Sequence, residues 1–253
     1  LSVAVAPVIS PKESFVYYKD LFDYMSDELG VRIDIRQRMS YEEVNTMLER
    51  NAVDLAFICT GAYVERSDGM GLLVAPEFKG SPYYYAYIIV HKDSDIQSFE
   101  DLRGRTFAFT DPLSNAGRLY AEQRLFDMKE TDEGFFASTV YTMSHDLSLQ
   151  MVARRLVEGA TVSSLIYHYV ESVHPEVVQD LRIVERSFPF GTPPVVHSLL
   201  LSPERKQKLQ DLLLGLHETE EGRRILDKLL IDRFVLVEDS LYNSVRTMYK
   251  NLQ

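Results

Sequence analysis

Four loops of the sequence carry hydroxyl, imidazole or amide side chains where a strand-like run passes into a helix-like run. They are Ser40–Tyr41, Thr60–Tyr63, the stretch from Thr110 to Gly117, and Ser144–Asp146. In an open parallel sheet the carboxyl ends of the strands share one edge, and ligands bind at that edge. Helix N-termini that meet there offer unpaired N–H groups, which suit a phosphate, phosphonate, sulfate or carboxylate. The loops therefore predict a small-anion site, and the alternative is that each is an ordinary helix cap.

The third loop is the most informative of the four. Ser114 and Asn115 supply a hydroxyl and an amide, and Gly117 lets the backbone approach a ligand closely. The sequence contains neither Gly-x-x-x-x-Gly-Lys-Ser/Thr nor Gly-x-Gly-x-x-Gly. Phosphate-loop nucleotidases and dinucleotide-dependent enzymes are therefore disfavoured.

The imidazole of His145 fits three roles, namely donation to a bound anion, capping or packing, and acid-base catalysis. Asp146 does not form a dyad with it by sequence alone, because adjacent residues on a helix do not face each other. Neither Gly-x-Ser-x-Gly nor His-Glu-x-x-His occurs, and the single cysteine, Cys59, sits in an apolar run typical of a buried thiol. We expect no metal, no cofactor and no catalytic residue.

A cluster of tyrosines lies beside an expected junction between two parts of the chain. Four of the five positions from Tyr83 to Tyr87 are tyrosine. Alternate tyrosines, such as Tyr84, could contact a ligand through the hydroxyl or through the face of the ring. A half-exposed strand would have the same pattern, so both interpretations stay open.

The composition limits the function classes. The 253 residues are 45% hydrophobic, and 27 Lys and Arg face 38 Asp and Glu, for a net charge of -11. Such a chain folds, and its charge disfavours nucleic-acid binding. A small anion remains compatible, because helix N-termini bind oxyanions without net positive charge. The longest apolar runs fall well short of the ~20 residues that cross a bilayer.

Strand and helix patterns alternate along the chain. Strand-like runs at 2–6, 31–35 and 53–59 are each followed by helix-like runs, and this order predicts an α/β fold with parallel, doubly wound strands. A second unit with the same pattern begins near Tyr87. The Pro- and Gly-rich stretch 187–194 is typical of a segment that crosses from one lobe to the other. We expect the helical runs that follow it to pack back onto the first lobe. We assign residues 1–86 plus 190–253 to lobe 1 and residues 87–189 to lobe 2.

Several motifs in this order resemble the phosphonate/phosphate/phosphite-type solute-binding proteins of ABC transporters. They are Val5-Ala6-Pro7, Val53-Asp54-Leu55-Ala56-Phe57, Thr60-Gly61-Ala62-Tyr63, Leu102-Arg103-Gly104, Phe107 to Ser114, and Ser144-His145-Asp146. The resemblance implies a two-lobe periplasmic binding protein-like fold of type II, each lobe a mainly parallel sheet flanked by helices. Two crossing strands, near 85–89 and 188–194, would join the lobes.

The same resemblance implies a function. The chain would be a periplasmic or extracytoplasmic monomer that captures a small phosphate- or phosphonate-like oxyanion in the interlobe cleft. It would present this ligand to an ABC transporter permease. An extracellular sensor domain of a membrane receptor, such as a histidine kinase, is one alternative. An enzyme that uses His145 as a base is a less favoured one.

The resemblance also implies which residues bind the ligand. Relatives often carry a hydroxyl pair where Asn115 and Ala116 stand, and often an aspartate where Thr161 and Ile166 stand. An ammonium-bearing ligand needs a carboxylate, so a neutral or apolar substituent near Ile166 and Tyr167 is expected. The full expected set is Tyr41, Thr60, Gly61, Ala62, Tyr84, Thr110, Ser114, Asn115, Ala116, His145 and Tyr167.

Overall fold

The computed structural model describes residues 1–252, which divide into two units. Unit 1 comprises Leu1–Pro7, Pro11–Tyr83 and Gly191–Asn243, and unit 2 comprises Val8–Ser10, Tyr84–Phe190 and the chain from Ser244. Residues 8–10 and the tail, which are expected in lobe 1, group with unit 2 through their contacts. In the tail, for example, Asn251 donates to the side chain of Gln123 at 3.1 Å.

Unit 1 contains a sheet with the strand order β13-β4-β12-β3-β1-β2. β2 and β3 pair with β1 in parallel, as expected, but β12 pairs antiparallel to both β3 and β4, and β13 antiparallel to β4. The α/β class is confirmed, while the expectation of a mainly parallel sheet is wrong because late strands enter this sheet in the opposite direction. The strands are β1 (Ser2–Val5), β2 (Asp34–Gln37), β3 (Leu55–Phe57), β4 (Met70–Glu77), β12 (Val195–Ser198) and β13 (Arg233–Val235).

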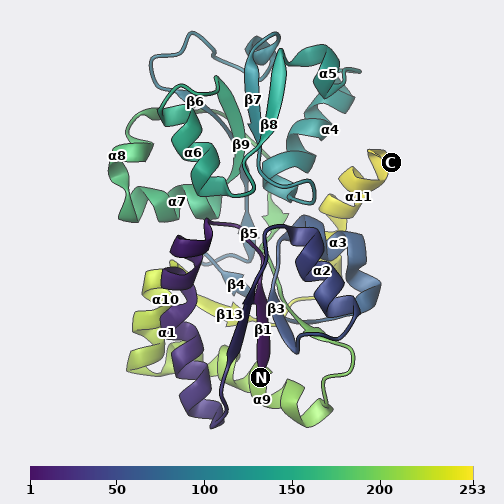
Figure 1. Ribbon diagram of the computed structural model, residues 1–253, viewed down its shortest axis with the longest axis vertical. Helices are drawn as coiled ribbons and strands as arrows, with labels where there is room; N and C mark the ends of the chain where they lie inside the picture. The colour runs from purple at the N-terminus through teal and green to yellow at the C-terminus, as the bar shows by residue number, and fades with distance from the viewer. Residues whose placement is uncertain (253) are drawn as a thin grey trace. The chain divides into compact units, whose positions relative to one another are not determined.

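The helices of unit 1 each bury one apolar face. α1 buries Leu21, Phe22 and Met25 against the core, and it lies beside α10 (Figure 1). At the start of α2, Ser40 and Glu43 form a capping box. The helices are α1 (Pro11–Leu29), α2 (Tyr41–Glu49), α3 (Thr60–Arg66), α9 (Pro203–Gly215) and α10 (Glu220–Leu229), with short 3₁₀ turns between some of them.

Unit 2 contains a second mixed sheet, of order β10-β6-β9-β7-β8. β7 is parallel to β8 and β9, whereas β6 is antiparallel to β9 and β10. The strands are β6 (Ala86–His91), β7 (Thr106–Phe109), β8 (Ser138–Tyr141), β9 (Gly159–Ser163) and β10 (Leu181–Arg186). Where the chain passes between units, β5 (Tyr83–Tyr84) and β11 (Phe190–Gly191) pair with each other.

Helices cover both faces of the unit 2 sheet. α6, α7 and α8 lie on one face, and α4 and α5 lie on the other (Figure 1). A π-helical turn, Asn115–Leu119, leads directly into α4. The helices are α4 (Tyr120–Asp127), α5 (Asp132–Phe135), α6 (His145–Ala153), α7 (Ser164–Val173), α8 (Pro175–Val178) and α11 (Asn243–Asn251). Among residues 1–252, every helix is too short or too polar to cross a membrane.

Candidate functional site

The loop after β7 turns sharply into a helix. Ser114 is fully buried, and its Oγ accepts a hydrogen bond from the Gly117 N–H at 3.0 Å. The Thr110 N–H donates to the Gly117 carbonyl at 2.9 Å, so the end of the strand is tied to the first turn of the helix. That turn is a π-turn, with the Leu119 N–H bonded to the Ser114 carbonyl. π-turns are frequent at functional sites, and the first N–H groups of a helix lack partners within the helix.

The ring of His145 is held in one tautomer. Its Nδ1 accepts the Ser163 N–H at 3.2 Å and lies 3.2 Å from Thr110 Oγ1. Because Nδ1 is an acceptor, the ring proton resides on Nε2. Burial lowers the pKa of His145 to about 3, so the ring is neutral near pH 7. His145 therefore offers an uncharged N–H donor.

Two further contacts join the other candidates of unit 2. One amide N–H of Asn115 donates to the Tyr84 hydroxyl at 2.9 Å, and both side chains are fully buried. The Ala116 carbonyl accepts from Thr161 Oγ1 at 2.6 Å. The structure thus brings six of the expected residues together in unit 2, namely Tyr84, Thr110, Ser114, Asn115, Ala116 and His145.

Unit 1 holds a second group of expected residues. Thr60, Gly61 and Ala62 form the first turn of α3, and Tyr41 begins α2. Asn45 connects the two helices, because its Nδ2 donates to the Ala62 carbonyl at 2.9 Å. The Thr60 hydroxyl donates to the Gly191 carbonyl at 2.9 Å, so its proton is already used within unit 1.

Tyr167 lies on α7 and packs against Tyr87. Its ring packs edge-on against Tyr87, with centroids 5.5 Å apart, and partial burial raises its pKa. Within residues 1–252 no hydrogen bond links Tyr167 to another expected residue. Cys59 is buried, as predicted.

Sequence reasoning missed two polar contacts next to His145. Ser163 caps α7 through its hydroxyl and holds the imidazole through its N–H. It ends strand β9 and precedes α7, so the pattern that selected the other four loops also applies to it. Asp146 Oδ1 accepts the Ser10 N–H at 2.8 Å, across 136 positions, and nothing in the local sequence signals this contact.

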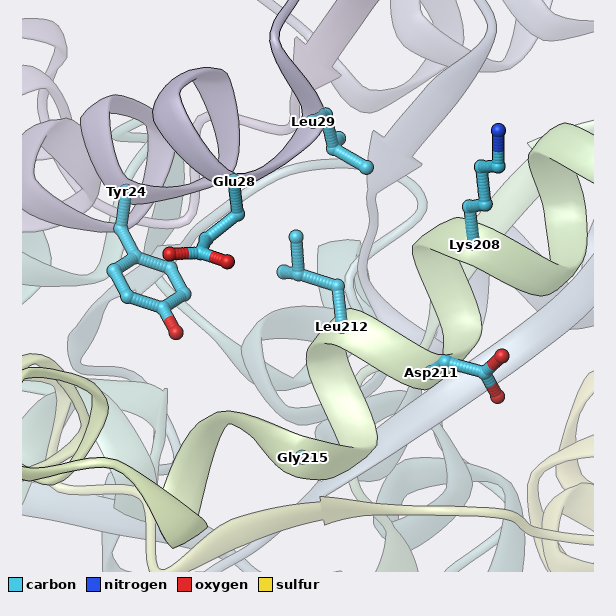
Figure 2. Close-up of a pocket in the computed structure, with 7 residues that line it drawn as sticks. All are labelled: Tyr24, Glu28, Leu29, Lys208, Asp211, Leu212 and Gly215. Atoms are coloured by element: carbon cyan, nitrogen blue, oxygen red, sulfur yellow. The ribbon is translucent and has the colours of Figure 1, made fainter.

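Figure 2 shows an open hollow elsewhere in unit 1, between α1 and α9, with a volume of about 490 Å³. Leu29 and Leu212 line it, and the exposed side chains of Glu28, Lys208 and Asp211 surround it. Ligand sites bring polar groups together in a largely enclosed pocket, which this mixed surface does not. The hollow contains none of the expected residues.

Two α/β units with mixed sheets and paired short strands where the chain passes between them define a type II periplasmic binding protein fold. A binding protein component of an ABC phosphonate transporter from Pseudomonas aeruginosa has a TM-score of 0.93 at 22% identity, covering 98% of this chain and 85% of that chain. PhnD1 of Prochlorococcus marinus, in complex with methylphosphonate, has a TM-score of 0.90 at 16% identity, covering 100% and 97%.

The chain belongs to the family described as ABC transporter, phosphonate, periplasmic substrate-binding protein, whose model matches residues 3–242. The phosphonates-binding periplasmic protein of Escherichia coli K12 is 26% identical over 212 residues, 81% of this chain and 62% of that protein. The phosphate-import protein PhnD of Mycolicibacterium smegmatis is 25% identical over 166 residues, 60% of this chain and 51% of that protein. The chain therefore spans less than two thirds of the length of these curated relatives. The family resemblance predicted from the motifs is confirmed.

Proposed function

We propose that the chain is the binding component of an ABC importer and holds a small phosphorus oxyanion such as phosphate, phosphite or methylphosphonate. Its family supports this role over that of a receptor sensor domain, and supports a location outside the cytoplasm. The partner is the membrane permease of the transporter. The observation that carries the proposal is a neutral, tautomerically fixed His145 joined through Thr110 to a helix that begins at Ser114.

The binding chemistry relies on dipoles. Among the described residues, none of the buried side chains is a lysine or an arginine. A bound oxyanion would accept hydrogen bonds from the His145 Nε2–H and from the N–H groups at the start of the helix that follows Ser114. Such N–H groups stabilise an anion through hydrogen bonds and through the helix dipole. The overall charge of -11 therefore does not oppose this role.

Unit 1 supplies a second set of contacts in the proposed ligand-bound protein. These are the N–H groups of the first turn of α3, from Thr60 to Ala62, together with Tyr41. The Thr60 hydroxyl is excluded as a donor because the Gly191 carbonyl already accepts its proton. A ligand that gains contacts from both units shifts the population toward the bound conformation without any chemical step.

The buried carboxylates favour a ligand without an amino group. Within residues 1–252 these carboxylates are Asp111 and Asp146, and each already accepts a backbone N–H at 2.8 Å, from Leu113 and Ser10 respectively. Thr161, where relatives often carry an aspartate, donates its hydroxyl proton to Ala116. Both of these carboxylates are already hydrogen-bonded to the backbone within unit 2, so we expect aminoalkyl phosphonates to bind more weakly than methylphosphonate.

The same geometry argues against catalysis by His145. A general base needs a free lone pair and a pKa near the working pH. The lone pair on Nδ1 faces the Ser163 N–H, and burial holds the pKa at about 3. We therefore propose binding without turnover.

Titration of the protein with defined anions tests the proposal. Phosphate, phosphite and methylphosphonate are expected to raise the melting temperature, since a ligand at ~100 times its Kd stabilises by about 2.7 kcal/mol. Sulfate and 2-aminoethylphosphonate serve as comparisons, and 2-aminoethylphosphonate should give a smaller rise. If none of the phosphorus oxyanions changes the melting temperature, the proposed function is wrong.

Two pairs of variants test the residues. Ser114→Ala removes the hydroxyl that holds the Gly117 N–H and so disturbs the N–H donors of this turn, whereas His145→Gln removes the Nε2–H donor. Each should weaken methylphosphonate binding about 10-fold, comparable to losing one hydrogen bond to a charged group. Ser138→Ala, on the exposed strand β8, and His168→Gln, on α7, are the matched controls and should bind as the wild type does. Unchanged affinity in both test variants would show that the site lies elsewhere.

A further inference from the structure

The segment Val8–Ser10 lies with unit 2, although the chain on both sides of it belongs to unit 1. The Val8 carbonyl accepts the His145 N–H at 3.0 Å, and the Ser10 N–H donates to Asp146 Oδ1 at 2.8 Å. Ile9, between them, is fully buried. The loop between β1 and α1 is therefore fastened to the first two residues of α6.

Asp146 makes this connection as a buried carboxylate. Its side chain is 5% exposed, and a carboxylate withdrawn from water is costly unless hydrogen-bond donors replace the water. The helix dipole favours a negative charge at the start of α6. This effect would be the same without Val8–Ser10, so it does not explain why the loop is bound to Asp146. The bond from Ser10 is charge-assisted and therefore among the stronger hydrogen bonds of unit 2.

The first turn of α6 is thus held from two sides. Thr110 and Ser163 fix the ring of His145, and Val8 fixes its backbone N–H. Pro7 and Pro11 flank the fastened segment, and proline restricts the backbone at both of its ends. The loop after β1 therefore restrains the first turn of α6, which carries His145.

We propose that Asp146 is a positioning residue that raises ligand affinity without touching the ligand, because it holds Val8–Ser10 on α6 in the ligand-bound conformation. The inference rests on the proposed function, in which His145 donates to the anion. Beyond that function, we infer that the loop after β1 and the ligand both stabilise the same arrangement of α6. Ligand binding should therefore strengthen the bond from Ser10 to Asp146.

The first test compares two substitutions of Asp146. Asp146→Ala removes the acceptor, whereas Asp146→Asn keeps an oxygen at Oδ1 and removes only the charge. Calorimetric titration with methylphosphonate and with phosphate should show about 10-fold weaker binding for Asp146→Ala, and about threefold or less for Asp146→Asn. Asp132→Ala is the control, because Asp132 begins α5 on the other face of the sheet and accepts the neighbouring Glu133 N–H.

The second test uses hydrogen exchange in the wild-type protein and does not depend on a variant that folds. The amide hydrogens of Ser10 and His145 should exchange more slowly when methylphosphonate is bound. Because a bound ligand slows exchange through global unfolding at every core amide, the gain at Ser10 and His145 must exceed the gain at a core amide such as Ile89 in β6. An equal gain at all three amides would overturn the inference. Equal affinity of the Ala and Asn variants would also overturn it. Failure of the wild type to bind either probe would instead refute the proposed function itself.

Discussion

A methyl group at position 117 has no room in the first turn of the unit 2 site. A Cβ there would lie 2.2 Å from Thr110 Oγ1 and 2.7 Å from Ser114 Oγ, whereas ordinary contacts begin near 3.4 Å. Both hydroxyls are fully buried and engaged, with His145 and with the Gly117 N–H respectively. Gly117→Ala must therefore displace the Thr110 side chain. This displacement disturbs the contact between Thr110 Oγ1 and His145 Nδ1.

Overpacking of this kind costs about 1–3 kcal/mol. For a chain of this size, each kcal/mol lowers the melting temperature by about 2–4 °C, so a loss of roughly 2–12 °C is expected. Methylphosphonate affinity should fall as well, because the donors at the start of the helix and the His145 ring both move. Thermal unfolding and calorimetric titration measure the two effects separately.

Gly215→Ala is the matched control. Gly215 ends α9 with φ −82°, and no neighbouring atom lies within 4 Å of an added Cβ. This variant should equal the wild type or gain about 0.5–1 kcal/mol, because alanine has less freedom to lose than glycine. A Gly117→Ala protein that melts with the wild type and binds with equal affinity would refute the reasoning.

Three further predictions concern stability. The pKa of His145 falls from 6.5 to about 3 on folding, so its contribution is complete above pH 6.5 and declines as the pH drops toward 3. Urea unfolding at pH 7 and pH 5 should show a loss of roughly 2 kcal/mol at pH 5 that His145→Gln lacks, and equal losses would contradict this. Ser40→Ala removes the capping box with Glu43 and should cost about 1 kcal/mol in urea unfolding, so an unchanged midpoint would count against the cap. Thr60→Val should lower the free energy of unfolding by about 1–3 kcal/mol, because it leaves the buried Gly191 carbonyl without its hydrogen-bond donor. Thr60→Ser keeps the hydroxyl and should retain the wild-type stability.

Local patterns predicted the elements that local physics determines. The helix-like runs expected after residues 31–35 and 53–59 correspond to α2 and α3, which begin at the predicted loops, at Tyr41 and Thr60. β12 was not predicted, because it follows a proline-rich stretch. Its place in the sheet depends on pairing with residues far earlier in the chain, Val195 opposite Phe57. The mixed character of both sheets arises from such distant pairings and has no local signal.

The candidate site shows the same division. The pattern of a strand, a hydroxyl and a helix located Ser114 and the start of α6, because capping is a local interaction. The pattern did not indicate that the Thr60 hydroxyl is used by Gly191, or that Tyr167 packs on Tyr87. Which polar groups remain available to a ligand is decided by contacts between distant segments.

The position of β12 in the middle of its sheet also affects the order of folding during synthesis. β12 joins the part of the unit 1 sheet that contains β3, β1 and β2 to the part that contains β4 and β13. β4 stays separate from β3, β1 and β2 until residue 198 of 253 has been made, and β13 is completed only at residue 235. All strands of the unit 2 sheet, in contrast, lie between residues 86 and 186. Because domains fold as their segments emerge from the ribosome, the unit that contains the first strand of this chain is the one that completes its sheet last.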